Sequence, residues 1–209
     1  MRRQTLLKIV GLMRGELNKG FTILEISKKL KIGYRPAYNH IISMGKEGII
    51  KTEKIGNAKQ SFLNLNNPKC RHLLEEIDSL KKEEIYKQYP ILMAVVESLV
   101  SKLTNIHTSE IHSIILFGSY SKGTATKKSD IDLLFIVTDL KNRQLRENID
   151  RESASYQYSH RIKISPLITD ISEFKIMLKS EELNVGKEVR EYGISLYGSE
   201  MFWRLVAGK

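Results

Sequence analysis

The sequence predicts an α/β (α+β) protein in which a small helical module precedes a module built around a mixed sheet. Residues 1–67 combine helix-period apolar patterns with a β-hairpin pattern, and residues 114–137 contain two strand-like apolar runs around a polar loop. The chain of 209 residues is also long enough to bury two small cores, since 41% of its residues are apolar. We therefore expect modules at residues 1–68 and 105–209, joined by a helical connector at residues 69–104.

The first module opens with a helix, because apolar residues from Leu6 to Met13 recur at helical spacing. Thr22 and Glu25 have the spacing of a capping box, which predicts the start of a short second helix. Pro36 fits the first turn of a third helix, where its missing amide hydrogen is harmless. The outward face of this third helix carries four side chains that can form hydrogen bonds: Arg35, Tyr38, Asn39 and Ser43.

Two short runs, residues 49–54 and 61–65, follow the third helix and predict a hairpin around Gly56-Asn57. Three helices and a hairpin in this order resemble the winged helix-turn-helix DNA-binding domains of bacterial and archaeal regulators. The resemblance implies that the third helix enters the major groove of DNA. It also implies that Lys54 and Lys59 of the hairpin contact phosphates or the minor groove.

The charge distribution supports a nucleic-acid partner for this module. Residues 1–69 hold 14 Lys or Arg against 4 Asp or Glu, a balance of +10 that equals the net charge of the whole chain. Binding of such a segment to DNA is driven by the release of counterions from phosphates. We expect Arg35 and Asn39 to contact base edges. Tyr38 and Ser43 are expected to contact the DNA backbone. Use of the module for protein docking or dimerisation is the alternative.

The connector is expected to consist of two helices. Residues 69–88 form a charged amphipathic pattern, and Pro90 separates it from a more apolar pattern over residues 91–103. Two roles stay open for these helices. They pack as a connector on the second module, or they form the interface of a homodimer, since winged helices often bind twofold-symmetric sites in pairs.

The second module contains the most informative stretch, IILFGSYSKGTATKKSDIDLLFIV at residues 114–137. One apolar run ends at Gly118-Ser119, and the next begins at Asp130. Residues two apart in a strand share a face, so Asp130 and Asp132 project side by side and need a cation. Mg²⁺ binds hard oxygen ligands and is commonly held by one or two carboxylates together with substrate phosphates. A glycine turn that opens a helix is suited to hold those phosphates. The pattern therefore predicts a site for a metal-bound nucleoside triphosphate.

A Gly-Ser pair, ten residues and Asp-x-Asp resemble the motif of the polymerase-beta-like nucleotidyltransferases, and most closely of their minimal single-domain branch. The resemblance covers roughly residues 105–200. It implies that Gly118 and Ser119 hold the triphosphate of an NTP, expected to be ATP. It also implies that Asp130 and Asp132 hold Mg²⁺ (or Mn²⁺).

The third carboxylate of this family has no clean match in the sequence. On the next predicted strand, residues 161–168, Lys163 or Ser165 occupies the face where the acid is expected. Asp170 lies just beyond, and two roles stay open for it: cap of the following helix, or third catalytic acid. Without a base, positioning and electrostatic stabilisation still support phosphoryl transfer, although at a reduced rate.

Other parts of the second module carry weaker signals. Lys122 and Ser129, in the loop between the two apolar runs, are expected to contact the nucleotide, although loop lysines are commonly only solvated. Phe202-Trp203 is expected to pack into the core. The remaining predicted elements are helices at residues 141–158, 172–178 and 186–192 and a last strand at residues 194–197.

Composition excludes several classes of protein. Cys70 is the only cysteine, so an intramolecular disulfide is excluded and a reducing, cytoplasmic location is expected. No stretch approaches the roughly 20 apolar residues of a membrane span, and the basic start lacks the apolar core of a signal peptide. None of the five histidines has metal-ligand spacing, so a zinc site is not expected.

Together these features predict a DNA-binding, Mg²⁺-dependent nucleotidyltransferase that transfers NMP from an NTP to a hydroxyl acceptor. Minimal members of the family often act as antitoxins that attach AMP to a partner toxin, so the resemblance implies a protein acceptor. Two alternatives stay open. One is a transcription regulator whose degenerate transferase domain only senses nucleotide. The other is an antitoxin that neutralises its partner by contact.

Overall fold

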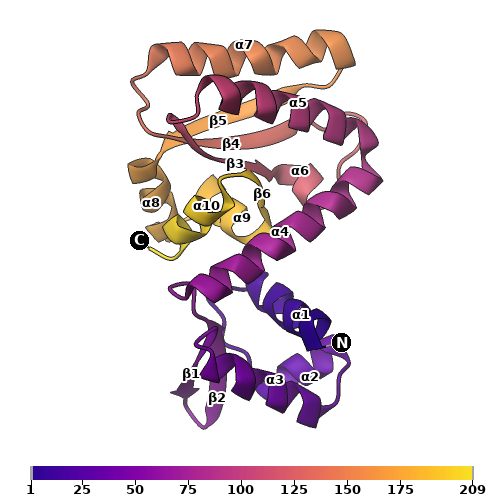
Figure 1. Ribbon diagram of the computed structural model, residues 1–209, viewed down its shortest axis with the longest axis vertical. Coiled ribbons are helices and arrows are strands. Elements are labelled where there is room, and N and C mark those ends of the chain that lie inside the picture. The colour runs from indigo at the N-terminus through magenta and orange to yellow at the C-terminus, as the bar shows by residue number, and fades with distance from the viewer. Residues whose placement is uncertain (1, 209) are drawn as a thin grey trace. The chain divides into compact units, whose positions relative to one another are not determined.

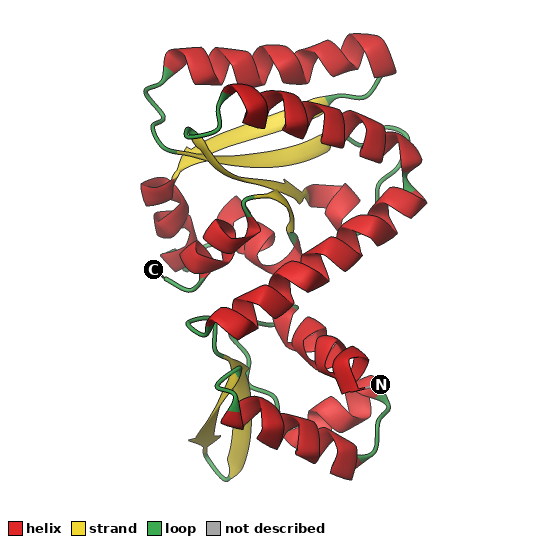
Figure 2. Ribbon diagram, in the orientation of Figure 1, coloured by secondary structure: helices red, strands yellow, loops and turns green. Residues whose placement is uncertain are grey.

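The computed structural model describes residues 2–208, apart from the side chains of Arg2 and Ser159. It divides into two compact units, Met1–Ile77 and Asp78–Lys209. Figure 1 labels the elements along the chain, and Figure 2 distinguishes helices, strands and loops by colour. Helices make up 57% of the chain and strands 19%, which confirms the predicted mixed α+β class.

The first unit contains three helices, a hairpin and the beginning of a long helix. In chain order these are α1 (Arg2–Arg14), α2 (Ile23–Leu30), α3 (Tyr34–Lys46), β1 (Ile50–Ile55), β2 (Ala58–Leu63) and α4 (Pro68–Gln88). The predicted capping box starts α2: the Glu25 amide donates to Thr22 Oγ1 at 3.2 Å, and the Thr22 amide donates to Glu25 Oε2 at 2.7 Å. The order of elements predicted for this part of the chain is confirmed.

Helix α3 has one buried and one exposed face. Ala37, Ile41 and Met44 are buried against the rest of the unit. This leaves the opposite face of α3 in solvent, as the apolar spacing predicts. Strands β1 and β2 pair antiparallel next to it, with Lys54 opposite Lys59 close to the turn.

The single cysteine of the chain is buried in α4. The Cys70 side chain is 0% exposed, and burial raises the pKa of its thiol to about 12. Because the thiolate is the reactive form, we expect Cys70 not to react with a disulfide reagent such as DTNB at mildly alkaline pH while the protein is folded. Unfolding in guanidinium chloride should release one reactive thiol per chain. Rapid labelling of the native protein would contradict this placement.

The second unit is built on a four-stranded sheet of order β5-β4-β3-β6. Strand β4 is antiparallel to β3 and parallel to β5, and β3 is also antiparallel to β6. A parallel pair needs a crossover, and α7 supplies it between β4 and β5. The bounds are β3 (Ile111–Phe117), β4 (Ile131–Val137), α7 (Arg143–His160), β5 (Ile164–Asp170) and β6 (Ile194–Tyr197).

Strand β5 starts later than the sequence predicts. The predicted strand runs over residues 161–168, whereas β5 begins at Ile164 and ends at Asp170. The reason is local, because Arg161 adopts a left-handed conformation with φ 57° and caps the C-terminus of α7.

Helices cover both faces of this sheet, as Figure 1 shows. Leu133 and Phe135 of β4 belong to a core shared with α5 (Pro90–Ile106) and α7. On the other face lie α8 (Ile171–Lys179), α9 (Val185–Tyr192) and α10 (Ser199–Val206). Burial on two faces explains why β3 and β4 are almost continuously apolar.

The C-terminal aromatic residues complete the core on the side of α8 to α10. Phe202 and Trp203 are fully buried, and Trp203 Nε1 donates a hydrogen bond to Asp78 Oδ2 at 2.9 Å. The expected packing role of this pair is confirmed, although its helix α10 is not predicted by the sequence pattern. Within residues 2–208, no helix combines the length and the apolar character that a membrane span requires.

Candidate functional site

The Gly118-Ser119 turn lies where β3 ends and the one-turn helix α6 (Gly118–Ser121) begins. Gly118 has φ +72°, a conformation that residues with a side chain rarely adopt. A Cβ atom at this position would lie 2.1 Å from Asp132 Oδ2. Glycine is therefore required here for two reasons, and it lets the Asp132 carboxylate lie directly against the turn.

Asp130 and Asp132 stand at the start of β4 and project from the same face of the sheet. In the strand register Asp132 lies opposite Phe117 of β3 and opposite Ser165 of β5. Ile131, between the two acids, is fully buried on the other face. The carboxylates therefore lie on the side that α8, α9 and α10 cover.

The Asp130 carboxylate has neighbours that compensate its charge. Lys163 Nζ forms an ion pair with Asp130 Oδ2, and Ser165 Oγ donates to the same oxygen at 3.1 Å. The hydrogen bond from Lys163 is the main cause that lowers the pKa of Asp130 below its ordinary value. A lysine thus supplies part of the positive charge that the sequence argument assigned to a metal ion.

The Asp132 carboxylate has different surroundings. Within the part of the chain that the structure describes, no donor forms a hydrogen bond with it. Burial raises the pKa of Asp132, and the negative charges of Asp130 and Glu188 raise it further. The charges of Lys163 and Lys122 offset part of this rise, but a partly buried carboxylate without a hydrogen-bond donor is the group at this site that would gain most from a bound cation.

These residues fit a magnesium or manganese ion. Both metals prefer hard oxygen ligands, and Mg²⁺ usually binds one or two carboxylates together with phosphates and water. Among residues 2–208, no three His, Cys, Asp or Glu side chains are grouped so as to hold a metal on their own. Two carboxylates leave the other coordination positions of such an ion to phosphate oxygens and water.

Helix α9 brings two further side chains to the site. Glu188 forms an ion pair with Lys122 at 2.5 Å, and Lys122 Nζ lies 5.2 Å from the centre of the Tyr192 ring. Glu188 and Tyr192 are four residues apart, so they lie on one face of α9. The spacing of Glu188 and Tyr192 predicts that they share a face of α9. Nothing in the sequence predicts that α9 lies next to β4.

Ser129 and Ser119 both form hydrogen bonds within the loop between β3 and β4. The Ser129 hydroxyl accepts a hydrogen bond from the Thr126 amide at 2.9 Å and thereby closes the turn before β4. The Ser119 carbonyl accepts a hydrogen bond from the Thr124 amide at 3.0 Å, which fastens the loop to the Gly-Ser turn. Both residues thus shape the loop between β3 and β4.

Asp170 is not brought to the carboxylate pair. In the parallel register it lies opposite Val137, whereas Ser165 lies opposite Asp132. Five residues of strand separate these positions, a distance of about 16 Å. The Asp170 carboxylate instead accepts a hydrogen bond from the Glu173 amide at 2.8 Å and caps α8.

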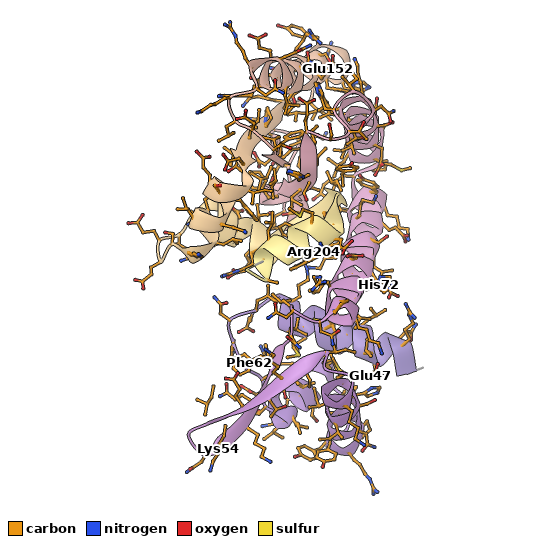
Figure 3. All side chains as sticks on the ribbon, turned by 60° about the vertical axis from the view of Figure 1, so that its left-hand side comes forward. Glu47, Lys54, Phe62, His72, Glu152 and Arg204 are labelled. Carbon is orange, nitrogen blue, oxygen red and sulfur yellow. The ribbon has the colours of Figure 1, made fainter. Side chains whose placement is uncertain are left out.

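The residues predicted to contact DNA lie on α3 and on the hairpin. All four predicted residues of α3 are exposed. Two of them, Asn39 and Ser43, also line a cavity of about 1050 Å³ together with Arg3 of α1 and His72 of α4. Lys54 lies close to the turn of the hairpin, where Figure 3 labels it. Arg35 and Tyr38 do not line this cavity.

Comparison with known sequences identifies the class of protein to which this fold and site belong. The chain belongs to the nucleotidyltransferase domain family, which matches residues 93–193. A relative from Methanocaldococcus jannaschii named "putative protein adenylyltransferase" is 31% identical over 116 residues, which cover 54% of this chain and 77% of that protein. A second protein of that name and organism is 25% identical over 105 residues, covering 50% of this chain and 98% of the relative.

Among solved structures, a crystal structure of a toxin-antitoxin with AMP-PNP aligns with a TM-score of 0.38 and 22% identity. The alignment covers 54% of this chain and 81% of that chain.

Proposed function

We propose that this protein is a metal-dependent nucleotidyltransferase that transfers NMP, with ATP as the donor, to a hydroxyl group of a partner protein. The observation that carries the proposal is the Asp132 carboxylate, which is partly buried without a hydrogen-bond donor, beside Asp130 and against the Gly118 turn. Membership of the nucleotidyltransferase family supports the activity. The two relatives named as protein adenylyltransferases support a protein acceptor.

Asp132 and one oxygen of Asp130 would hold the metal ion. When bound, Mg²⁺ or Mn²⁺ neutralises phosphate charge and stabilises the charge that develops during transfer. The backbone of Gly118 and Ser119 would hold the phosphates, because glycine permits their close approach. Lys122 would exchange its ion pair with Glu188 for a phosphate oxygen.

In the transfer, the acceptor hydroxyl oxygen forms a bond to the α-phosphorus of the nucleotide. The bond from that phosphorus to the oxygen of the leaving pyrophosphate breaks, and the hydroxyl proton passes to water or to a base. Lys163, which immediately precedes β5, and Ser165 of β5 contact Asp130, and Asp170, the acid of β5, lies at the far end of that strand. Catalysis would therefore depend on positioning and charge neutralisation, and turnover is expected to be slow.

Incubation with ATP labelled at the α-phosphate tests this function. The candidate acceptors are the chain itself and the products of neighbouring genes, each with Mg²⁺, with Mn²⁺ and with a chelator. We expect metal-dependent label on one acceptor, which persists with Asp170→Ala and disappears with Asp132→Asn. If wild type binds ATP but labels no acceptor above the Asp132→Asn background, the transferase function is refuted.

We further propose that residues 1–68 form a winged helix-turn-helix domain that binds DNA. Three helices, a hairpin and an exposed α3 support this proposal. So does the balance of +10 in residues 1–69, since the remainder of the chain holds equal numbers of basic and acidic residues.

Arg35→Ala is expected to weaken binding to a specific DNA site by about 1–3 kcal/mol, because an arginine that contacts a guanine edge contributes about this much. Fluorescence anisotropy with the DNA upstream of the protein's own gene measures the effect. Arg143→Ala, which removes an equal charge from the exposed end of α7, is the matched control and should bind as wild type does. Equal affinities of the two variants would contradict a role of α3 in DNA binding.

A nucleotide-sensing regulator is the second candidate function. The contacts of Lys163 and Ser165 with Asp130, at the place where the third acid of the family is expected, favour it. It predicts that ATP binds without turnover and that DNA affinity changes when ATP is added. By thermodynamic reciprocity, DNA must then change ATP affinity by the same factor. Calorimetry that shows two independent binding events would exclude this function.

A further inference from the structure

The parallel register of β4 and β5 fixes Lys163 beside the carboxylate pair. Ile131 is opposite Ile164, so Lys163 and Asp130 are the residues that immediately precede the two paired strands. The Ile131 amide donates to the Lys163 carbonyl at 2.9 Å, which ties the backbones together at this end. The position of Lys163 is therefore set by the sheet and not only by its flexible side chain.

The Lys163 ammonium and the Ser165 hydroxyl share one oxygen of Asp130. Both donate to Oδ2, Ser165 at a distance of 3.1 Å. A carboxylate oxygen has about two lone-pair sites, so these two donors saturate Oδ2 and leave Oδ1 for a metal. Asp132 keeps both oxygens free of hydrogen-bond donors within residues 2–208.

We propose that Lys163 is a built-in cation that takes the place of a second metal ion, so that the site binds a single Mg²⁺ or Mn²⁺ with the nucleotide. This inference rests on the proposed transferase or nucleotide-binding site. Two divalent ions in one site lie about 3.5–4 Å apart and need oxygen ligands between and beside them. On the side of β5, the chain supplies an ammonium and a hydroxyl, and the ammonium repels a second ion.

Lys163 also has donors to spare for a phosphate. An ammonium group carries three N–H donors, and the Lys163 side chain is 56% exposed while it contacts Asp130. The remaining donors are therefore open to solvent beside Asp130, and we expect one of them to reach a phosphate oxygen of the bound nucleotide. Lys163 therefore lowers the affinity of the nucleotide-free site for a metal ion and raises its affinity for the nucleotide.

Equilibrium dialysis tests the metal count. Both chambers contain Mn²⁺ and an ATP analogue with a methylene bridge between its α and β phosphorus atoms. The excess of Mn²⁺ in the chamber with the protein gives the number of ions bound to the chain. Wild type should bind one ion, and Lys163→Asp, which adds a carboxylate, should bind two. In the absence of nucleotide, Lys163→Met should bind Mn²⁺ about tenfold more tightly, because a competing cation has left Asp130. The same variant should bind the analogue more weakly.

Lys179→Met is the matched control, because it removes an exposed lysine near the end of α8 and changes the net charge equally. Two ions in wild type would overturn the inference and leave the proposed function intact. So would metal and analogue affinities in Lys163→Met that equal those in Lys179→Met. An absence of saturable Mn²⁺ binding in wild type, with or without the analogue, would remove the proposed function as well. If Lys163→Asp does not fold, Lys163→Met, which keeps the aliphatic stem, decides the question.

Discussion

Asp132→Asn is expected to reduce metal-dependent nucleotide transfer by about 10²–10³-fold or more, the loss typical when a principal electrostatic group is removed from an active site. The amide has nearly the shape of the carboxylate, so it still fits against the Gly118 turn. It lacks the negative charge that a divalent ion requires of its few protein ligands. Transfer of α-phosphate label from ATP measures the effect, with Asp170→Ala as the control acid on the same sheet.

The same substitution is expected to stabilise the folded protein. Burial and the charges of Asp130 and Glu188 raise the pKa of Asp132. When a pKa is higher in the folded than in the unfolded state, protonation favours folding, and this contribution is lost as the pH rises through the folded pKa. At neutral pH the ionised carboxylate therefore opposes folding, and asparagine removes that cost.

We expect the Tm of Asp132→Asn to rise by about 2 °C or more at neutral pH. The difference from wild type should shrink toward acid pH, where the wild-type carboxylate is protonated. Asp170→Ala should show the reverse pattern, with activity kept and about 1 kcal/mol of stability lost with the cap of α8. A lower Tm together with lost activity in Asp132→Asn would mean that Asp132 supports the fold rather than the chemistry.

Gly118→Ala is expected to abolish transfer and to destabilise the protein by about 2–4 kcal/mol. A residue with a Cβ pays about 1–2 kcal/mol in the left-handed conformation, and Gly118 has φ +72°. In addition, the new Cβ would lie 2.1 Å from Asp132 Oδ2, so the turn or the carboxylate must move. Either movement disturbs the place where the phosphates and the metal are expected to meet.

Gly56→Ala separates the cost of the left-handed conformation from the cost of the close contact with Asp132. Gly56 has φ +59° in the hairpin turn, with nothing within 4 Å of an added Cβ, so this variant shows the cost of the conformation alone. Unfolding in guanidinium chloride should give a loss of about 1–2 kcal/mol for Gly56→Ala and a clearly larger loss for Gly118→Ala. Similar losses in the two variants would show that Asp132 does not lie against the turn.

Local patterns in the sequence predict much of this fold. Thr22 and Glu25 specify the start of α2 by a contact between residues three apart, and both partners are visible in the chain. The alternation around Ile131 places Asp130 and Asp132 on one face, because the two-residue period of a strand needs no knowledge of its neighbours. Glycine at position 118 follows from the turn that must join strand to helix.

The rest of the site depends on contacts between distant segments. Asp170 is the acid nearest to the predicted strand at residues 161–168, yet the register of β4 and β5 places it at the end of β5 that lies far from Asp130 and Asp132. Lys163 and Asp130 meet because two strands pair, and Glu188 reaches the site because α9 packs on the sheet. Such long-range pairings have no periodicity in a single sequence. The conformation of Arg161 is likewise not predicted by the sequence pattern, and its left-handed backbone delays the start of β5.

A crystal structure with Mn²⁺ and the methylene-bridged ATP analogue would decide whether the acid pair is a metal-nucleotide site. Anomalous scattering should show one Mn²⁺ bound by Asp132 and by Oδ1 of Asp130, in contact with phosphate oxygens beside Gly118, with Lys163 still on Oδ2. A nucleotide bound elsewhere, or no Mn²⁺ peak at Asp132 in crystals that contain the analogue, would contradict the proposed site.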